Sequence, residues 1–409
     1  MNKQNLLALF VCLSCLACRP QVRALNEEVI TDDAPSDSEV IPLPGREFPY
    51  EEETPGSLFD PNTVMDVRVS ISEDDWNQLR FERRELFDVF GEQCMEPLSD
   101  VYNYYPADMT VDGEALDNIG IRTKGFFGSI NPDRPSLKVK IDKYENGQRY
   151  KGHKRFTFNN QNQDFSRLIT CMSYYIFRQM GVPASRCNFA KMSINDENFG
   201  VYTNVEPIKE PLLARLFGDD SGNLYEGTIA DLRTGFTARI EKKTNEETDD
   251  WSDMEQLIAA IEAPDDRFLE DLEAILDVDA FMRFMAVEAM INHWDGFSGN
   301  MNNYYFYNDP SNNKFYFIPW GIDAGLRDDE GYYYDREGEE PQERMSTRPQ
   351  HVFASSMLAR RLYEYPDTHD RYRELMSDML HARWHTEKFL LELERMRALI
   401  NPYVFNPND

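Results

Sequence analysis

Residues 293–300 read HWDGFSGN, and residues 318–325 read IPWGIDAG. The first stretch follows residues 279–292, which are apolar around most of a helical circumference, as expected of a helix buried on nearly all sides. Between the two stretches, NYYFY at 303–307 and KFYFI at 314–318 flank the turn NDPSNN and predict a β-hairpin. Polar side chains on the loops at both ends of one hairpin can converge on a cation. Their carboxylate and amide oxygens suit magnesium, manganese or calcium.

This order of elements resembles the catalytic core of protein kinases. Kinases place a buried helix, then His-x-Asp with an Asn five positions after the Asp, then two strands and Asp-x-Gly. Here His293, Asp295 and Asn300 have that spacing, and Asp323 begins an Asp-Ala-Gly sequence after the hairpin. In kinases the first Asp takes the proton of the acceptor hydroxyl, while the Asn and the second Asp hold metal against the phosphates.

The sequence before residue 206 predicts a sheet with one long helix, because apolar residues alternate in short segments bounded by turn residues. The expected strands span 65–71, 108–111, 118–124, 136–141, 155–159, 187–194 and 199–205, and the expected helix spans 164–180. After residue 206 the expected helices span 251–261, 265–276, 279–292 and about 370–400. We therefore expect an α+β protein, sheet-rich over 57–206 and mainly helical over 207–403.

Several segments between residues 120 and 326 resemble the CotH kinase-like proteins of spore coats and bacterial surfaces. The segments are GIRTKG, SLKVKID followed by GQRYKG, FTFNNQNQDFSRL, GVPASRCNFAKMSIN with FGVYTNVE, GNLYEG, and NHWDGFSGN with NNYYFY and FIPWGID. The resemblance implies an atypical, kinase-like two-lobed fold with a sheet-rich N-lobe and a mainly helical C-lobe. It also implies ATP and a divalent metal (magnesium or manganese, with calcium as an alternative) in the cleft, and phosphorylation of a protein substrate.

The same resemblance assigns roles to residues of the hairpin region. Asp295 would be the catalytic Asp, and Asp323 would bind metal. The second metal ligand would be Asn300 or Asn303: the kinase spacing indicates Asn300, and the Asn-before-Tyr pattern of the family indicates Asn303.

Nucleotide contacts are expected from the sheet-rich half. The phosphate-contacting lysine would be Lys138 or Lys140, and we expect only one of the two to point into the cleft. Glu206, near the connector between the lobes, is a candidate adenine-side contact or a salt-bridge partner. The turn KGFFG at 124–128 is a weak match to a phosphate-covering loop.

Three features depart from the family pattern. After the hairpin the family usually reads Trp-Asp-x-Asp, whereas this chain has Gly321 in place of the first Asp. The predicted 164–180 helix contains no Glu for the usual Lys–Glu pair. Glu226 stands where relatives often carry Lys after GNLY. These departures favour an alternative function, a catalytically weak relative that binds surface or coat proteins during assembly.

The first 56 residues predict an export signal and a tether. Residues 1–18 contain the apolar run LLALFVCLSCLA behind Lys3, which is too short to span a bilayer as a helix and indicates a signal peptide. The signal resembles that of a bacterial lipoprotein, with Cys18 as the lipidated residue; secretion without a lipid is the alternative. Residues 19–56 carry ten acids, three arginines and six prolines, a composition typical of a solvated tether. We expect an exported protein, periplasmic or cell-surface, held to the membrane only by its lipid.

Charge and cysteines narrow the function classes further. Acidic residues outnumber basic ones by 73 to 43, for a formal net charge of −30, which argues against nucleic-acid partners and against docking on anionic lipid. A nucleotide cleft in such a chain would depend on its divalent cation. Export permits a disulfide, and Cys171 with Cys187 is the expected pair, with two unpaired core cysteines as the alternative. The acidic segment 327–350, with eight acids, motivates a third hypothesis, a calcium-stabilised adhesion domain.

Overall fold

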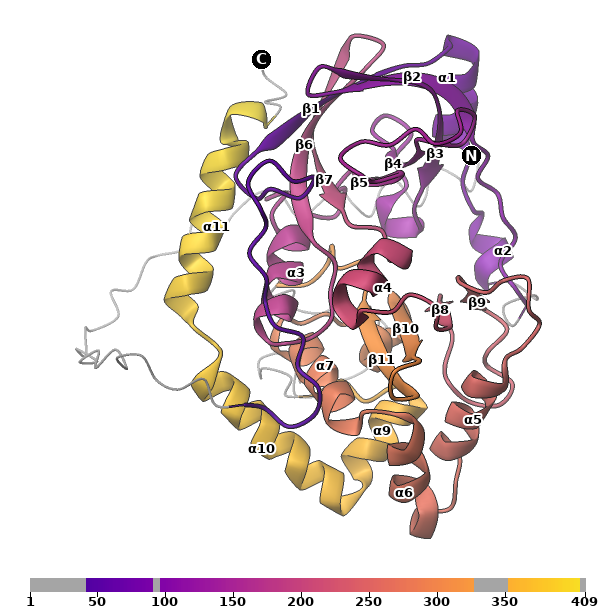
Figure 1. Ribbon diagram of the computed structural model, residues 1–409, viewed down its shortest axis with the longest axis vertical. Helices are drawn as coiled ribbons and strands as arrows, with labels where there is room; N and C mark the ends of the chain where they lie inside the picture. The colour runs from indigo at the N-terminus through magenta and orange to yellow at the C-terminus, as the bar shows by residue number, and fades with distance from the viewer. Residues whose placement is uncertain (1–41, 91–95, 327–351, 405–409) are drawn as a thin grey trace, which may run out of the picture. The chain divides into compact units, whose positions relative to one another are not determined.

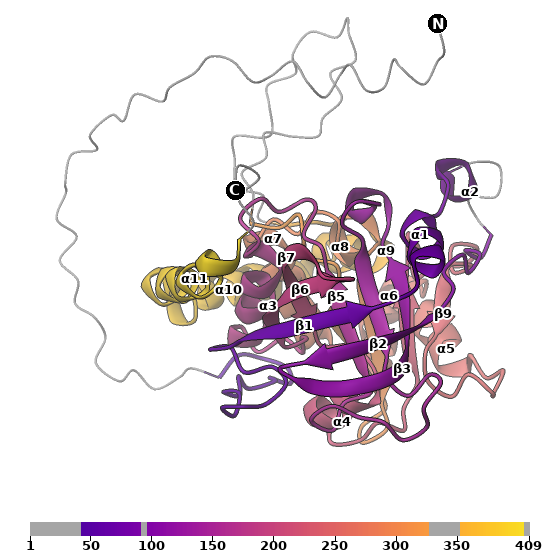
Figure 2. The ribbon, with the colours of Figure 1, turned by 90° about the horizontal axis from the view of Figure 1, so that it is seen from above.

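A closed β-barrel is built by the first half of the chain in the computed structural model, which describes residues 42–90, 96–326 and 352–404 (Figure 1). The strands are β1 (Val64–Ser70), β2 (Tyr105–Val111), β3 (Glu114–Lys124), β4 (Ser136–Lys140), β5 (Arg155–Asn159), β6 (Cys187–Ile194) and β7 (Glu197–Val205). Their order around the barrel is β1-β2-β3-β4-β5-β7-β6, and parallel pairing of β1 with β6 closes it. Figure 2 shows β1, β2 and β3 side by side. Closure leaves the sheet without an open edge.

Alternation of apolar and polar residues determines which side of each strand is buried. In β1, for example, Val67 and Val69 are buried while Arg68 is exposed. The inward side chains of the strands form one apolar cluster that also holds Trp76 and Leu79 of helix α1 (Glu73–Phe81). The period of two read from the sequence therefore predicts the buried face of this sheet correctly.

The long helix of the first half starts later than expected. Helix α3 spans Ile169–Gln179, whereas we predicted 164–180 with Asp164 as its N-cap. Arg167 adopts a left-handed backbone (φ 62°), which separates Asp164 from the helix. The Asp164 carboxylate nevertheless accepts the backbone N–H of Ile169 at 2.7 Å, so it still satisfies a donor of the first turn.

A second sheet and most of the helices follow the barrel. Its strands are β8 (Leu224–Gly227), β9 (Ile240–Lys242), β10 (Tyr304–Asp309) and β11 (Lys314–Pro319), in the order β11-β10-β8-β9. The helices are α2 (Leu86–Phe90), α4 (Glu210–Phe217), α5 (Ser252–Ile261), α6 (Asp265–Ile275), α7 (Val278–Met290), α8 (Phe297–Asn300), α9 (Met357–Glu364), α10 (Pro366–Ala382) and α11 (Thr386–Ile400). Helix α7 packs against β11, and ten of its thirteen residues are buried, as its all-round apolar pattern predicts.

The α+β class expected from the sequence is confirmed. The closed barrel was not expected, because its closing pair, β1 with β6, joins segments more than a hundred residues apart, a pairing that strand propensity does not encode. The barrel ends at Val205 and the second sheet begins at Leu224, on either side of the boundary expected at residue 206. One core cluster contains side chains from both sides of that boundary, among them Phe177 and Phe284.

Residues 42–56 correct the expected tether. Leu43 and Phe48 in this segment are buried, with 5% and 3% of their surface exposed. The Arg46 guanidinium pairs with the carboxylate of Asp309 at the end of β10, and Glu47 accepts a hydrogen bond from Arg383 at 2.8 Å. The segment is therefore part of the folded body, because Leu43 and Phe48 pack into apolar clusters of the protein. The signal sequence, Cys18 and the rest of the tether lie outside the described residues.

A disulfide joins Cys171 of α3 to Cys187 at the start of β6, with the two Cα atoms 5.2 Å apart. It closes a loop of 16 residues. Replacing both cysteines by Ala is expected to lower the free energy of unfolding by about 3 kcal/mol, because the open loop gains entropy in the unfolded chain. Chemical denaturation of the parent, the double variant and the parent with reductant measures the difference. An unchanged midpoint for the double variant would contradict this expectation.

In the part of the chain that the structure describes, no helix has both the length and the apolar character needed to cross a bilayer.

Candidate functional site

Helix α7 ends just before the loop that carries Asp295. The backbone N–H of His293 donates to the carbonyl of Glu288 at 2.7 Å, and Asn292 takes a left-handed conformation (φ 53°) that turns the chain. His293 is buried, and burial lowers the pKa of its imidazole to about 3, so the ring is neutral at physiological pH. His293 therefore serves the end of the helix as a neutral core side chain.

Three asparagines surround the carboxylate of Asp295. The side-chain amides of Asn300 and Asn303 donate to it at 2.6 and 2.7 Å, and that of Asn302 lies at 3.3 Å. Asn303 also donates to the Asp295 backbone carbonyl at 3.1 Å. Burial raises the pKa of Asp295, while the three amides act in the opposite direction. The result is a fixed, desolvated carboxylate that is a stronger base than an exposed Asp.

Glu288 supports the loop that carries Asp295. Its carboxylate, fully buried in α7, accepts the backbone N–H groups of Phe297 and Ser298, each at 3.0 Å, where α8 begins. A Cβ at Gly296 would lie 1.9 Å from Glu288 Oε1, so this close approach requires glycine. Burial raises the pKa of Glu288 to about 8, although the hydrogen bonds from Ser298 and Phe297 oppose the shift. Glu288 was not among the residues predicted from the sequence; the signal for it was an acid in the last turns of a mainly apolar helix.

Asp323 lies beside a lysine that the sequence analysis did not select. With its amide nitrogen facing Asp323, Gln163 donates to both carboxylate oxygens, at 3.2 and 3.3 Å. Lys124, the last residue of β3, donates to Asn159 at 2.5 Å. Burial lowers the pKa of Lys124 to about 8, and the negative charge of Asp323 opposes that shift. Lys124 is the first residue of the KGFFG turn. That turn was predicted as a phosphate-covering loop because of its glycines, and its lysine was not predicted as a site residue.

Asn303 connects the two ends of the hairpin. Its amide nitrogen contacts Asp295, and its backbone carbonyl accepts the N–H of Trp320 at 3.0 Å. On the other side, a Cβ at Gly321 would lie 2.3 Å from Asn303 Oδ1, and Gly321 has a left-handed φ of 57°. The family's Asp at this position would therefore clash with Asn303 in this conformation. The structure brings Asp295, Asn303 and the Gly321–Asp323 turn into one continuous set of contacts.

Lys138 and Lys140 share one face of β4, which corrects the expectation that only one points into the cleft. Side chains two residues apart lie on the same side of a strand, and the intervening Val139 is buried in the barrel. In the strand register Lys138 lies opposite Arg122 of β3, whereas Lys140 lies opposite Arg155 at the start of β5. Burial lowers the pKa of Lys138 to about 7, with the charge of Glu226 opposing the shift.

Glu226 has a lysine partner of its own. Lys243 lies 2.8 Å from its carboxylate. Burial alone would raise the pKa of Glu226, but the charges of Lys243 and Lys138 lower it to about 2. The acid that replaces the usual lysine in this chain is thus neutralised by a lysine from the segment after β9.

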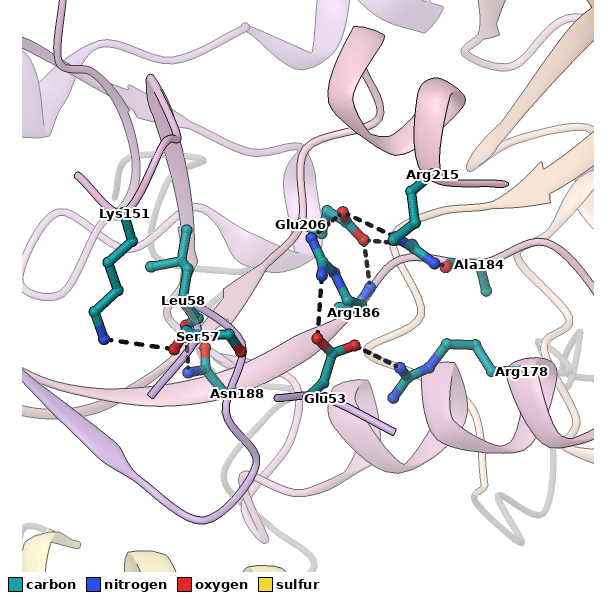
Figure 3. A network of polar contacts seen from close by, with 10 residues as sticks. All are labelled: Glu53, Ser57, Leu58, Lys151, Arg178, Ala184, Arg186, Asn188, Glu206 and Arg215. Carbon is teal, nitrogen blue, oxygen red and sulfur yellow. Dashed lines mark hydrogen bonds and ion pairs between the residues drawn. The ribbon is translucent and has the colours of Figure 1, made fainter. Parts of the chain in front are cut away.

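Glu206 belongs to an ion-pair network (Figure 3). Arg186 and Arg215 contact its carboxylate at 2.8 and 2.6 Å, and Arg186 also reaches Glu53 at 3.0 Å. Glu206 is 2% exposed. Burial raises its pKa, but the two arginines more than compensate and the pKa is lowered overall. Of the two roles considered for Glu206, the structure places its side chain in the salt bridge; its carboxylate is not grouped with Asp295 and Asp323.

Asp323 and Asn303 both place side-chain oxygen atoms at the Gly321–Asp323 turn. Within residues 42–90, 96–326 and 352–404, no three His, Cys, Asp or Glu side chains gather as a metal site. Magnesium, however, takes one or two protein oxygens and completes its shell with water and substrate phosphates. Asp323 and the Oδ1 atom of Asn303 supply such oxygens. The acidic segment 327–350, which motivated the calcium hypothesis, lies outside the described residues.

Comparison with known proteins gives matches over most of the chain. A family model described as CotH kinase protein matches residues 121–407, a range that contains every candidate residue from Lys124 to Asp323. The chain is 26% identical to the inner spore coat protein H of Bacillus subtilis (strain 168), over 81% of this chain and 91% of that protein. It is 26% identical to invasin CotH2 of Rhizopus delemar over 41% of this chain and 31% of that protein. For invasin CotH7 of the same organism the identity is 25%, over 54% and 39%.

Proposed function

The chain belongs to the CotH kinase protein family, and from this premise we propose that it transfers phosphate from ATP to hydroxyl groups of a protein substrate, with magnesium or manganese as cofactor. One observation carries the proposal. Asp295 and Asp323 stand on the two loops that flank the β10–β11 hairpin, and Asn303 contacts the first and adjoins the turn of the second. This arrangement supports the proposal, because metal-dependent phosphoryl transfer needs a base and a metal ligand in one site.

In the proposed reaction Asp295 accepts the proton of the substrate hydroxyl. The hydroxyl oxygen forms a bond to the γ-phosphorus as the bond from that phosphorus to the bridging oxygen of ADP breaks. The proton passes to the Asp295 carboxylate, and the electron pair of the broken bond stays on ADP. Burial of Asp295 raises its pKa and so favours this proton transfer, while its three amide donors hold it in one orientation.

Asp323 and Asn303 would hold the divalent cation, which when bound offsets charge on the phosphates. Lys124 would contact the phosphates from the barrel side, with Lys138 further along the same face. In the kinase-like interpretation the barrel acts as the N-lobe and the second sheet with its helices as the C-lobe, joined near residue 206. These assignments extend the α+β fold to a two-lobed fold and are part of the proposal.

Replacing Lys124 by Met is expected to lower kcat/KM for ATP by about 10- to 100-fold, since one charge-assisted hydrogen bond is removed. The measurement is transfer of labelled phosphate by the full chain with Mn²⁺ or Mg²⁺ over a range of ATP concentrations. Lys388→Met, on the exposed face of α11, is the matched control and should leave kcat/KM unchanged. Equal values for both variants would remove Lys124 from the site.

A second candidate function is binding without catalysis, in surface or coat assembly. The conformation of Gly321 favours it, because the turn has no room for the carboxylate that the family usually carries there. The name of the B. subtilis relative, an inner spore coat protein, agrees with such a role. Absence of labelled product from the parent chain, at every metal tested and with full thermal stability, would favour this function over the first.

Export is the third part of the proposal. The signal pattern at residues 1–18, with Cys18 as lipid attachment site, would place the protein on the periplasmic or cell-surface side of a membrane. The Cys171–Cys187 disulfide agrees with an oxidising compartment. The expected partner there is a protein substrate or a coat protein.

A further inference from the structure

A basic pocket lies at the side of the barrel away from the β3–β4 turn. Its volume is about 330 Å³, and the segment between β4 and β5 lines it together with the start of α4. The charged residues of its wall are Arg149, Lys154, Arg155, Lys209, Glu206 and Glu210. Four basic side chains thus face two acids in a chain whose formal net charge is −30. A local excess of positive charge against that background indicates a site for an anion.

Glu206 adds no net negative charge to this wall. Arg186 and Arg215 both contact its carboxylate, and Glu53 is in turn contacted by Arg186 and by Arg178 at 3.5 Å (Figure 3). The network therefore sets three arginines against two acids. The surface behind the pocket is therefore neutral to positive, although Glu206 and Glu210 are among the lining residues.

Two of the four cations are held only loosely by protein groups: Arg155 lies 3.9 Å from Glu210, and Arg149 donates to a backbone carbonyl at 3.4 Å. The other two have closer partners, since Lys209 donates to the backbone carbonyl of Lys243 at 2.9 Å and Lys154 lies 3.1 Å from Asp142. Burial lowers the pKa of Lys209 and the positive charge of Lys243 adds to that effect, which an incoming anion would reverse. The N-terminal end of α4, which begins at Glu210, directs the positive end of its dipole to the same pocket.

We propose that this pocket binds a phosphate group, either the monoester of a phosphorylated Ser or Thr of a polypeptide or free inorganic phosphate. A dianionic group with three acceptor oxygens matches several separate cations better than a carboxylate does, and arginine binds such groups through paired N–H donors. The volume admits the phosphate with its side chain. The inference does not depend on the catalytic proposal, because neither Asp295 nor Asp323 lines this pocket.

The test measures fluorescence anisotropy of a labelled ten-residue peptide with one phosphoserine between uncharged residues, beside its unphosphorylated form, with the full chain. The Asp295→Asn chain is used in parallel so that no phosphate transfer interferes. We expect the phosphopeptide to bind to both chains and the unphosphorylated peptide to bind at least about tenfold more weakly. The double variant Arg155→Gln/Lys209→Gln should weaken phosphopeptide binding by about 100-fold, one factor of ten for each cation.

The control is Arg267→Gln/Arg397→Gln, which removes the same charge from two exposed helix positions and should change binding by less than about twofold. Competition with inorganic phosphate separates the two sources. Displacement at a phosphate concentration near the peptide's Kd supports a site for free phosphate, whereas a far higher requirement supports a phosphorylated polypeptide. Equal binding of both peptides, or equal loss in the pocket and control variants at unchanged melting temperature, overturns the proposal.

Discussion

Replacing Asp295 by Asn is expected to reduce phosphate transfer by about 10²- to 10⁴-fold, the range that a positioned general base contributes. The substitution keeps the size of the side chain but removes its capacity to take a proton. It also presents an N–H group to the three asparagine amides that now donate to the carboxylate. KM for ATP should change little, because Asp295 acts on the acceptor hydroxyl rather than on the nucleotide.

Asp253→Asn is a matched control for this variant. The Asp253 carboxylate also accepts three side-chain donors, from Tyr225, Asn223 and Asn308 at 2.6, 3.0 and 3.2 Å, but at the far side of the second sheet. It should cost similar stability and leave the rate unchanged. If Asp295→Asn retained more than a tenth of the parent rate, Asp295 would not be the base.

Replacing Glu288 by Gln is expected to change how stability depends on pH. The pKa of Glu288 rises from 4.5 to about 8 on folding because of burial, so the folded protein holds a proton that the unfolded chain has released between those values. Its contribution to stability is therefore fully present below pH 4.5 and lost as pH rises to about 8, at about 1.4 kcal/mol per pH unit. The total loss is roughly 5 kcal/mol.

Glutamine carries no such proton, so the free energy of unfolding of the variant minus that of the parent should increase with pH across this window. Urea denaturation of both chains from pH 5 to pH 8 measures it, and the difference cancels all other titrating groups. Glu206→Gln is the control. The pKa of Glu206 is lowered from 4.5 by Arg215 and Arg186 against the effect of burial, so its contribution to stability is lost only as pH falls below about 4.5, and the difference for this variant should stay flat from pH 5 to pH 8. A flat difference for Glu288→Gln would show that its carboxylate is ionised in the folded protein.

Local sequence pattern predicted the elements around the site well. The 155–159 strand was predicted with the bounds that the structure gives, and the ends of the buried helix and of the hairpin after it differ from the prediction by at most two residues. These segments combine strong periodicity with clear turn residues, so short-range preferences and tertiary packing agree. Asp295 and Asp323 could be identified from the sequence for the same reason, because the first follows the end of a helix and the second follows the end of a strand.

The remaining features depend on contacts between distant segments. Lys124 became a candidate only when folding brought β3 beside Asp323, and Glu288 only when its carboxylate met the loop ten residues later. The strand pattern alone places Lys138 and Lys140 on the same face of the strand, because side chains two residues apart point to the same side, and our expectation did not follow this rule. Burial of Leu43 and Phe48 could not be read from composition, because ten acids in the wider segment conceal how few apolar residues are needed to anchor it.

The path of residues 42–56 has a mechanical consequence. Arg283 of α7 donates to the backbone carbonyls of Pro44 and Arg46, and the N–H of Phe48 donates to the carbonyl of Gly181 at 3.0 Å. Tension applied at residue 42 would thus load the buried helix that precedes the Asp295 loop before it reached any strand of the barrel. A pulling force on the N-terminal segment would therefore act first on helix α7, which leads into the Asp295 loop.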